Sequence, residues 1–195
     1  MLRPPDLVAI DEIGEVLSIK SPETVEIKFR RGSFLVDIDK VLSSDHRSIT
    51  NKARDKYRNP KQTLIFFGLK KNMSVIEVSP GKGWYTEVLA PTLKKNGKFY
   101  ATIYKVNDDS RPFIKKLDSS YRSMLKKHPE KYSKTNLIPI DLKNPKFNLS
   151  EKVDMVLTFR NVHNWTKAKT DLIMFKSFFN SLKKGGVLGV VEHRA

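Results

Sequence analysis

The 195-residue chain contains no cysteine, which excludes disulfides, thiolate-bound metals and a cysteine nucleophile. It also lacks an apolar run of the length that a membrane-spanning helix needs. Its first six residues lack the apolar core of a secretory signal. The 39% hydrophobic content is nevertheless enough to build a core. The sequence therefore predicts a soluble cytoplasmic protein.

Acidic residues are outnumbered, with 37 Lys/Arg against 21 Asp/Glu and a net charge of +16. Residues 1–45 contain 6 Lys/Arg and 9 Asp/Glu, a net charge of −3, so the remainder carries +19. A basic body attracts nucleic acid, anionic membrane or acidic protein. The lysines are scattered, however, and no basic patch is interleaved with aromatic residues. Nucleic acid is thus a partner that the charge allows but the pattern does not favour.

The N-terminal segment has the alternating pattern of half-buried β-strands. It predicts a small antiparallel β meander with strands at residues 15–19, 24–29 and 33–38. We expect a boundary at residue 45, so that residues 1–45 and 46–195 form two domains. A meander of about 40 residues is marginally stable alone and needs a partner surface.

From residue 48 onward, helical and strand segments alternate. This order predicts an α/β domain with a doubly wound, mainly parallel, Rossmann-like sheet. Strands are expected at residues 73–79, 97–104, 137–140, 153–159 and 187–191. Helices are expected at residues 48–58, 60–67, 83–95, 111–127 and 167–182. Pro91 should kink or shorten the third of these helices.

Residues 73–85 hold the most informative pattern. A short apolar strand is followed by the turn Pro80-Gly81-Lys82-Gly83 and then by residues of helical composition. This order places backbone N–H groups and a helix N-terminus at the carboxyl edge of the sheet, where open α/β folds bind nucleotide-like ligands. The glycines permit positive φ and close approach of a ligand.

The run Glu77-Val78-Ser79-Pro80-Gly81-Lys82-Gly83 resembles motif I of class I S-adenosylmethionine (SAM) dependent methyltransferases, acid-x-Gly-x-Gly-x-Gly. Ser79 stands at the first glycine position. Other stretches resemble a bacterial group of predicted methyltransferases: Arg-Asp-Lys-Tyr-Arg-Asn-Pro at 54–60, Trp-Tyr-Thr-Glu-Val-Leu-Ala-Pro at 84–91 and Thr-Phe-Arg-Asn-Val-His-Asn-Trp at 158–165. The resemblance covers residues 48–195. It implies that SAM is the cofactor and that a methyl group is transferred to an unidentified acceptor, with a small molecule favoured.

The same resemblance implies cofactor-binding residues at the ends of the first, third and fourth strands: Glu77, Ser79, Gly81, Gly83, Tyr85, Asp141, Arg160 and Asn161. Asp141 would accept the adenine amino group, or it simply begins a surface turn. Arg160 and Asn161 would bind the methionine carboxylate, or they hold the loop. The second strand ends in Ile103-Tyr104-Lys105, where the family has an acid for the ribose hydroxyls.

His163 is the candidate catalytic residue. It is the one side chain of its polar cluster that titrates near neutral pH, which suits a general base. The alternative is a hydrogen-bonded structural histidine. His46, His128 and His193 lie in separate segments without ligand spacing, so we predict no metal site.

Two further expectations concern the ends of the chain. Residues 1–42 resemble part of a small cyanobacterial SH3-like protein of the SipA type, which interacts with a sensor kinase. The methyltransferase family continues past the fifth strand, whereas this sequence stops at Ala195, so the resemblance implies a C-terminally truncated domain. Its exposed sheet edge would favour a protein partner or self-association.

Three functional hypotheses follow from the sequence. The first is a SAM-dependent methyltransferase. The second is a non-catalytic methyltransferase-like scaffold or regulator-docking protein. The third and least favoured is a basic nucleic-acid-binding protein.

Overall fold

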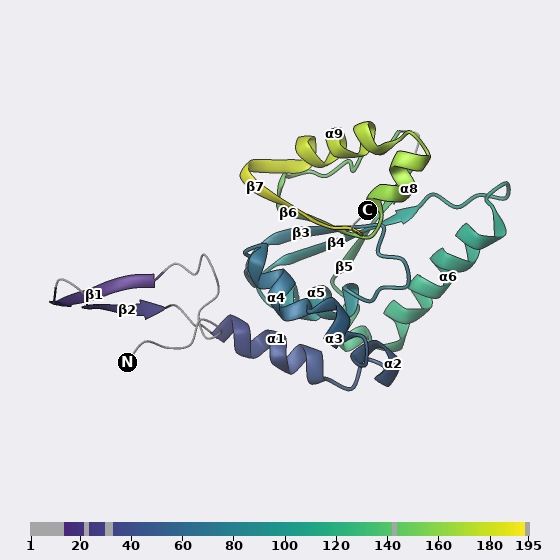
Figure 1. Cartoon of the computed structure of the whole chain (residues 1–195). Coiled ribbons are helices and arrows are strands. Elements are labelled where there is room, and N and C mark those ends of the chain that lie inside the picture. Colours follow the sequence, from purple (N-terminus) through teal and green to yellow (C-terminus); the bar gives the residue numbers. More distant parts are fainter. Residues whose placement is uncertain (1–13, 22–23, 30–32, 142–143, 194–195) are drawn as a thin grey trace. The chain divides into compact units, whose positions relative to one another are not determined.

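The computed structural model describes residues 14–21, 24–29, 33–141 and 144–193 (Figure 1). The chain divides into two compact units, residues 1–36 and residues 37–195. The assignment of residues 1–45 to a partial SH3-like module stays a prediction. None of the helices in the described ranges has both the length and the apolar character needed to span a bilayer.

The first unit contains a two-stranded antiparallel sheet. Strand β1 (Gly14–Ser21) pairs with β2 (Thr24–Phe29). The strand predicted at residues 33–38 is wrong, because these residues begin helix α1 (Ser33–Ser43). Leu35, Ile38 and Leu42 recur at helical spacing. A short apolar run fits the period of a strand and that of a helix alike, and only this longer repeat favours the helix.

The second unit is built on a parallel sheet of five strands, which confirms the predicted fold class. Its strand order is β5-β4-β3-β6-β7. The strands are β3 (Ser74–Val78), β4 (Lys98–Tyr104), β5 (Thr135–Ile140), β6 (Val153–Phe159) and β7 (Leu182–Val191). From β3 the chain first builds outward to β4 and β5, and then returns to add β6 and β7 on the other side. The carboxyl ends of β3 and β6 therefore border a topological switch point, where such sheets bind ligands.

Helices lie on both sides of this sheet, with α4 and α5 on one side and α8 and α9 on the other (Figure 1). The longer ones are α4 (Pro60–Phe66), α5 (Thr86–Leu93), α6 (Pro112–Lys127), α8 (Val162–Lys167) and α9 (Asp171–Ser181). The others are α2 (Ile49–Lys52), α3 (Asp55–Arg58) and α7 (Pro129–Tyr132). Thus α2 and α3 replace the single helix predicted at 48–58, and Pro91 lies inside α5.

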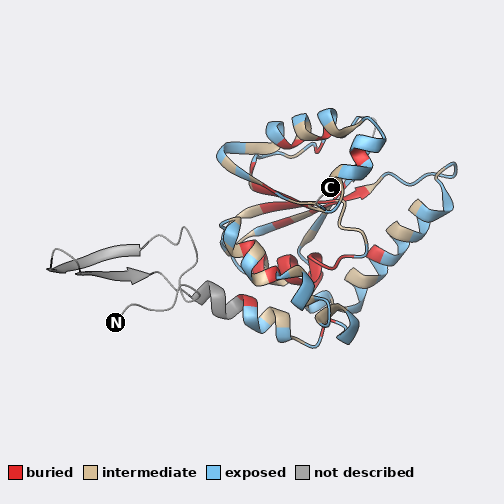
Figure 2. Ribbon diagram, in the orientation of Figure 1, coloured by how far each residue is buried: buried red, intermediate tan, exposed pale blue. Residues whose placement is uncertain are grey.

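Alternation along β3 sends its side chains into two different layers. Ile76 and Val78 belong to the core that also contains Phe178 of α9. Glu77 points to the opposite layer, where its carboxyl group contacts Thr86 of α5. Buried residues accordingly concentrate on the strands and on α5 (Figure 2).

Asp154 joins three strands at the amino edge of the sheet. The N–H and the hydroxyl of Ser74 both donate to its Oδ2 at 2.7 Å, and Lys183 Nζ donates to its Oδ1 at 2.7 Å. Burial alone would raise the pKa of Asp154, but the hydrogen bonds from Lys183 and Ser74 outweigh it and hold that pKa at about 2. The starts of β3, β6 and β7 are therefore fixed to one ionised carboxylate.

Candidate functional site

The turn after β3 has the backbone that its glycine pattern predicts. Gly81 and Gly83 have φ of +62° and +85°, and the Gly83 N–H donates to the carbonyl of Pro80 at 3.0 Å. Ser79 also has positive φ, +52°, which costs a residue with a Cβ about 1–2 kcal/mol. Its N–H donates to Thr102 Oγ1 at 2.8 Å, and this bond fastens the turn to β4.

The two glycines face different surroundings. A Cβ added to Gly81 would meet nothing within 4 Å, so the turn is open there. A Cβ added to Gly83 would overlap Met124 Cε of α6 and lie 3.1 Å from the ring of Tyr121. Gly81 therefore leaves space for a ligand, whereas Gly83 allows α6 to pack.

Asn161 connects the ends of β3 and β6. Its Nδ2 donates to the carbonyls of Val78 and Ser79 at 3.2 and 3.3 Å, and to Thr158 Oγ1 at 3.0 Å. The next residue upstream, Arg160, has φ of +62°, and its N–H donates to the carbonyl of Val191 at 2.7 Å. One amide side chain thus sets the spacing of the two strand ends that border the switch point.

A hollow of about 330 Å³ opens at this switch point. It brings together six of the residues predicted to bind a cofactor: Glu77, Ser79, Gly81, Tyr85, Arg160 and Asn161. Gly83, Asp141 and His163 do not line it. The wall also contains Trp84 and five residues for which the sequence predicts no binding role: Arg54, Arg58, Pro80, Lys82 and Phe159.

A signal for the two arginines exists in the sequence. Arg54 and Arg58 are four residues apart, which places them on one face of a helix. Nothing in that spacing, however, shows which part of the molecule the face meets.

Glu77 is only 2% exposed. Thr86 Oγ1 donates to its Oε2 at 2.6 Å, and the Tyr121 hydroxyl lies 3.0 Å from the same Thr86 oxygen. Burial raises the pKa of Glu77 to about 8, although the Thr86 hydrogen bond opposes the shift. At neutral pH the carboxyl group is therefore mostly protonated.

Aromatic rings form another side of the hollow. Tyr85 and Phe159 stack with centroids 3.5 Å apart and planes 9° from parallel. Trp84 meets Tyr85 edge to face at 4.7 Å and carries the Arg58 guanidinium 4.6 Å above its ring. Trp84 and Tyr85 are both at most 5% exposed, so they belong to the core and to the wall at once. Trp165 instead packs on Phe178 in the core.

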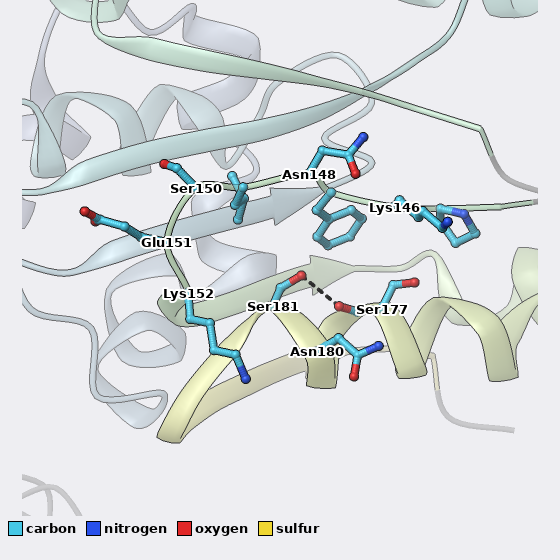
Figure 3. A pocket seen from close by; sticks show the side chains of 11 residues that line it. Lys146, Asn148, Ser150, Glu151, Lys152, Ser177, Asn180 and Ser181 are labelled. Carbon is cyan, nitrogen blue, oxygen red and sulfur yellow. Dashed lines mark hydrogen bonds between the residues drawn. The ribbon is translucent and has the colours of Figure 1, made fainter.

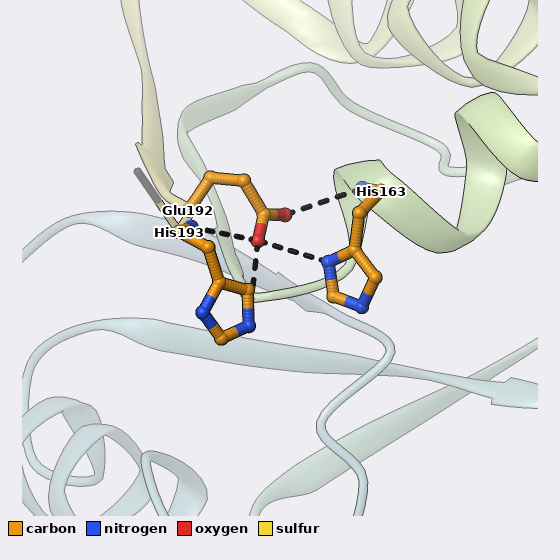
Figure 4. A group of neighbouring side chains, drawn as sticks. All are labelled: His163, Glu192 and His193. Atoms are coloured by element: carbon orange, nitrogen blue, oxygen red, sulfur yellow. Dashed lines mark hydrogen bonds and ion pairs between the residues drawn. The ribbon is translucent and has the colours of Figure 1, made fainter. Parts of the chain in front are cut away.

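His163 belongs to a neighbouring cluster at the same sheet edge (Figure 4). Its Nδ1 lies 2.9 Å from Glu192 Oε1, and its backbone N–H donates to Glu192 Oε2 at 3.3 Å. The N–H of His193 donates to Glu192 Oε1 at 2.9 Å. Burial alone would raise the pKa of Glu192, but these hydrogen bonds outweigh it and lower that pKa to about 2.

The same three residues could hold a metal ion, because one ligand atom from each lies within 4.8 Å of the others. The prediction of no metal site treated His193 as isolated, and the structure instead places it beside His163 and Glu192. Arg160 contacts both ring nitrogens of His193 at 3.0 Å, and a guanidinium there opposes a bound cation. The absence of a metal site stays a prediction.

Asp141 lies apart from the hollow. It is exposed at the end of β5 and forms an isolated bridge with Asn144. Tyr104 and Lys105, at the end of β4, do not line the hollow either. The hollow therefore corresponds to the glycine-turn side of the switch point, and the adenine-binding role of Asp141 stays a prediction.

A second hollow, of about 350 Å³, lies between residues 145–152 and the end of α9 (Figure 3). Residues 150–152 immediately precede β6, so this hollow is at the amino edge of the sheet. Ser177 and Asn180 belong to its lining, which contains none of the predicted site residues. We therefore assign the candidate site to the carboxyl edge.

Three solved structures with a similar fold are methyltransferases. A SAM dependent methyltransferase from Aquifex aeolicus is 21% identical with a TM-score of 0.54, and the match covers 81% of this chain and 72% of that one. TrmN from Thermus thermophilus is 14% identical with a TM-score of 0.52, covering 85% and 44%. A protein-L-isoaspartate O-methyltransferase is 14% identical with a TM-score of 0.50, covering 91% and 41%. The chain thus spans less than half the length of the last two.

At these identities the likeness establishes the fold, which is that of class I SAM-dependent methyltransferases. Residues 1–41 separately match a family model described as Protein CHLORORESPIRATORY REDUCTION 42-like. No curated protein matches the sequence. The SipA-type resemblance and the C-terminal truncation stay predictions.

Proposed function

We propose that the chain is a SAM-dependent methyltransferase that binds SAM in the hollow between the β3 turn and the end of β6. The observation that carries the proposal is a buried hydroxyl at this place. Ser79 lines the hollow, and its Oγ is buried and has no hydrogen-bond partner among the described residues. A buried polar atom without a partner costs about 1–3 kcal/mol, and a polar ligand would relieve that cost.

The other residues of the wall fit the amino-acid end of SAM. Arg160 offers a guanidinium group, which suits a carboxylate. Gly81 leaves room for the ligand to approach the backbone, and the Tyr85–Phe159 stack gives an apolar side that excludes water. When bound, SAM supplies a methyl group already activated by its sulfonium, so the protein mainly has to align the reactants.

We propose His163 as the general base. Its Nδ1–H donates to the Glu192 carboxylate, which leaves the Nε2 lone pair to accept a proton from the acceptor. Glu192 is then a positioning residue that fixes the tautomer and the ring orientation. Because His163 lies beside the hollow and not on its wall, the acceptor would extend beyond the hollow toward α8.

Calorimetric titration with SAM and with S-adenosylhomocysteine (SAH) tests the proposal. We expect both to bind, and Phe159→Ala to weaken both because it removes one ring of the stack. Asn180→Ala, in the hollow at the amino edge, is the matched control and should bind like the unmodified protein. A folded protein that binds neither ligand at millimolar concentration would contradict the proposal.

A second candidate is a non-catalytic docking protein, favoured by the separate family match of residues 1–41. Strand β7 supports an interaction role, because it is an edge of the sheet and exposes Val187 and Val190. This candidate predicts that neither SAM nor SAH binds and that the protein self-associates or binds a protein partner. Sedimentation with and without SAH separates the two candidates.

A further inference from the structure

The hollow at the carboxyl edge is lined by an excess of positive charge. Arg54 and Arg58 come from the α3 segment, Lys82 from the glycine turn and Arg160 from the end of β6. The carboxyl group on the same wall is that of Glu77, which burial keeps mostly protonated at neutral pH. Four cations therefore face the hollow with almost no negative charge to balance them.

These cations are not neutralised elsewhere. Within the described residues, none of the four forms an ion pair with a carboxylate. Arg58 lies over the Trp84 ring, and Arg160 contacts the His193 ring. Burial and the neighbouring charges of Arg54 and Arg160 lower the pKa of Arg58, so the guanidinium groups oppose one another. An anion placed between them would remove that repulsion.

The acid of α3 does not offset this charge. Asp55 lies between the two arginines in sequence, but its carboxylate accepts hydrogen bonds from Arg47 at 2.7 and 2.8 Å. It is absent from the wall of the hollow. The segment thus presents its cations to the hollow and directs its acid to a buried partner.

SAM alone does not balance this wall. It has one carboxylate, together with an ammonium and a sulfonium, so its net charge is positive. We infer that the methyl acceptor is an anionic small molecule, carrying phosphate or carboxylate groups that bind Arg54 and Arg58. Guanidinium groups bind both kinds of oxyanion through paired hydrogen bonds. The identification of this anion as the methyl acceptor rests on the proposed function, but the anion site itself can be tested separately.

The test is calorimetric titration of the full chain at fixed ionic strength, with pyrophosphate and citrate as the probes. We expect at least one probe to bind, and Arg54→Gln and Arg58→Gln each to weaken it by about tenfold, the loss of one charge-assisted contact. The relative affinity of the two probes distinguishes phosphate from carboxylate recognition. Among the described residues Arg54 has no side-chain hydrogen-bond partner, so its variant should fold even if Arg58→Gln, which loses the contact with Trp84, does not.

Arg122→Gln is the matched control, because it removes the same charge from an exposed pair on α6. Equal weakening by this variant, or no binding of either probe, would overturn the inference. So would competition between probe and SAH, since the anion would then only occupy the place of the methionine carboxylate. Tighter binding of a single-stranded RNA oligonucleotide than of both probes would also overturn it. If a probe binds and SAH does not, the proposed function fails while the anion site stands.

Discussion

Arg47 and Asp55 form a two-point ion pair in which the arginine side chain is completely buried. Arg47 Nη1 and Nη2 donate to the Asp55 carboxylate at 2.7 and 2.8 Å, and Arg47 Nε lies 3.5 Å from Glu87 Oε2. Asn51 Nδ2 donates to Glu87 Oε1 at 2.9 Å. The network connects α2 and α3 to α5, so it fixes the segment that carries Arg54 and Arg58 to the domain.

Replacing Asp55 should show how strongly the buried Arg47 charge depends on its ion-pair partner. Asp55→Ala leaves the Arg47 charge with the Glu87 carboxylate, 3.5 Å away, as its remaining ion-pair partner, so we expect the free energy of unfolding to fall by about 3 kcal/mol, as for other broken buried pairs. Urea denaturation measures the change. Glu151→Ala, which removes an exposed pair with Lys98, should leave stability essentially unchanged. Equal effects of the two variants would show that burial of Arg47 does not matter.

The raised pKa of Glu77 predicts a specific pH dependence. Below about pH 4.5 the carboxyl group is protonated in both states, whereas between about 4.5 and 8 only the unfolded chain releases the proton. The stability that protonated Glu77 contributes is therefore lost as pH rises through this window. Between about pH 4.5 and 8, the free energy of unfolding of the unmodified protein should fall by several kcal/mol relative to that of Glu77→Gln, at about 1.4 kcal/mol per pKa unit.

Denaturant titrations of both proteins at several pH values between 4 and 9 measure this difference. Glu151→Gln is the exposed control, and its pH profile should parallel that of the unmodified protein. Parallel profiles for Glu77→Gln would mean that Glu77 is ionised in the folded state.

The two glycines of the turn should respond differently to alanine. Both substitutions place a Cβ at positive φ, at about 1–2 kcal/mol each. Gly83→Ala also overlaps Met124, which adds about 1–3 kcal/mol of overpacking. We therefore expect Gly83→Ala to lower stability more than Gly81→Ala, and Gly81→Ala to have the larger effect on SAH affinity relative to its effect on stability. If Gly81→Ala lowered stability more than Gly83→Ala, α6 would not pack closely against Gly83.

Ser79→Gly should be more stable than Ser79→Ala by up to about 1.5 kcal/mol. Relief of the left-handed backbone, about 1–2 kcal/mol, exceeds the entropy of about 0.5–1 kcal/mol that glycine adds to the unfolded chain. Ser79→Ala keeps the strained backbone and removes only the hydroxyl. Thermal denaturation of the two variants separates backbone strain from the buried hydroxyl. A Ser79→Gly protein no more stable than Ser79→Ala would contradict the prediction.

The fold of the second unit could be predicted from the sequence because its signals are local. Strand β6 matches residues 153–159, where an apolar run is bounded by polar residues. The failure at residues 33–38 is local too, since the apolar run there fits a strand and a helix alike.

The site was less predictable because it depends on contacts between distant segments. Pairing of Phe159 with Val191 is what brings Glu192 and His193 to His163, and no sequence spacing encodes that register. The Arg54 and Arg58 face was visible as a helical repeat. Its direction depends on the ion pair between Arg47 and Asp55, which only the folded chain reveals.

Because of Asp154, the amino ends of β3, β6 and β7 should tolerate fewer substitutions than their carboxyl ends. A change at this residue would disturb β3, β6 and β7 together, so the amino edge is costly to alter. The hollow at the carboxyl edge is lined by residues such as Arg54, Gly81 and Lys82, which take no part in the Asp154 network. Descendants of this sequence could therefore exchange one bound molecule for another by substitutions in a few loops, while inheriting an unchanged sheet.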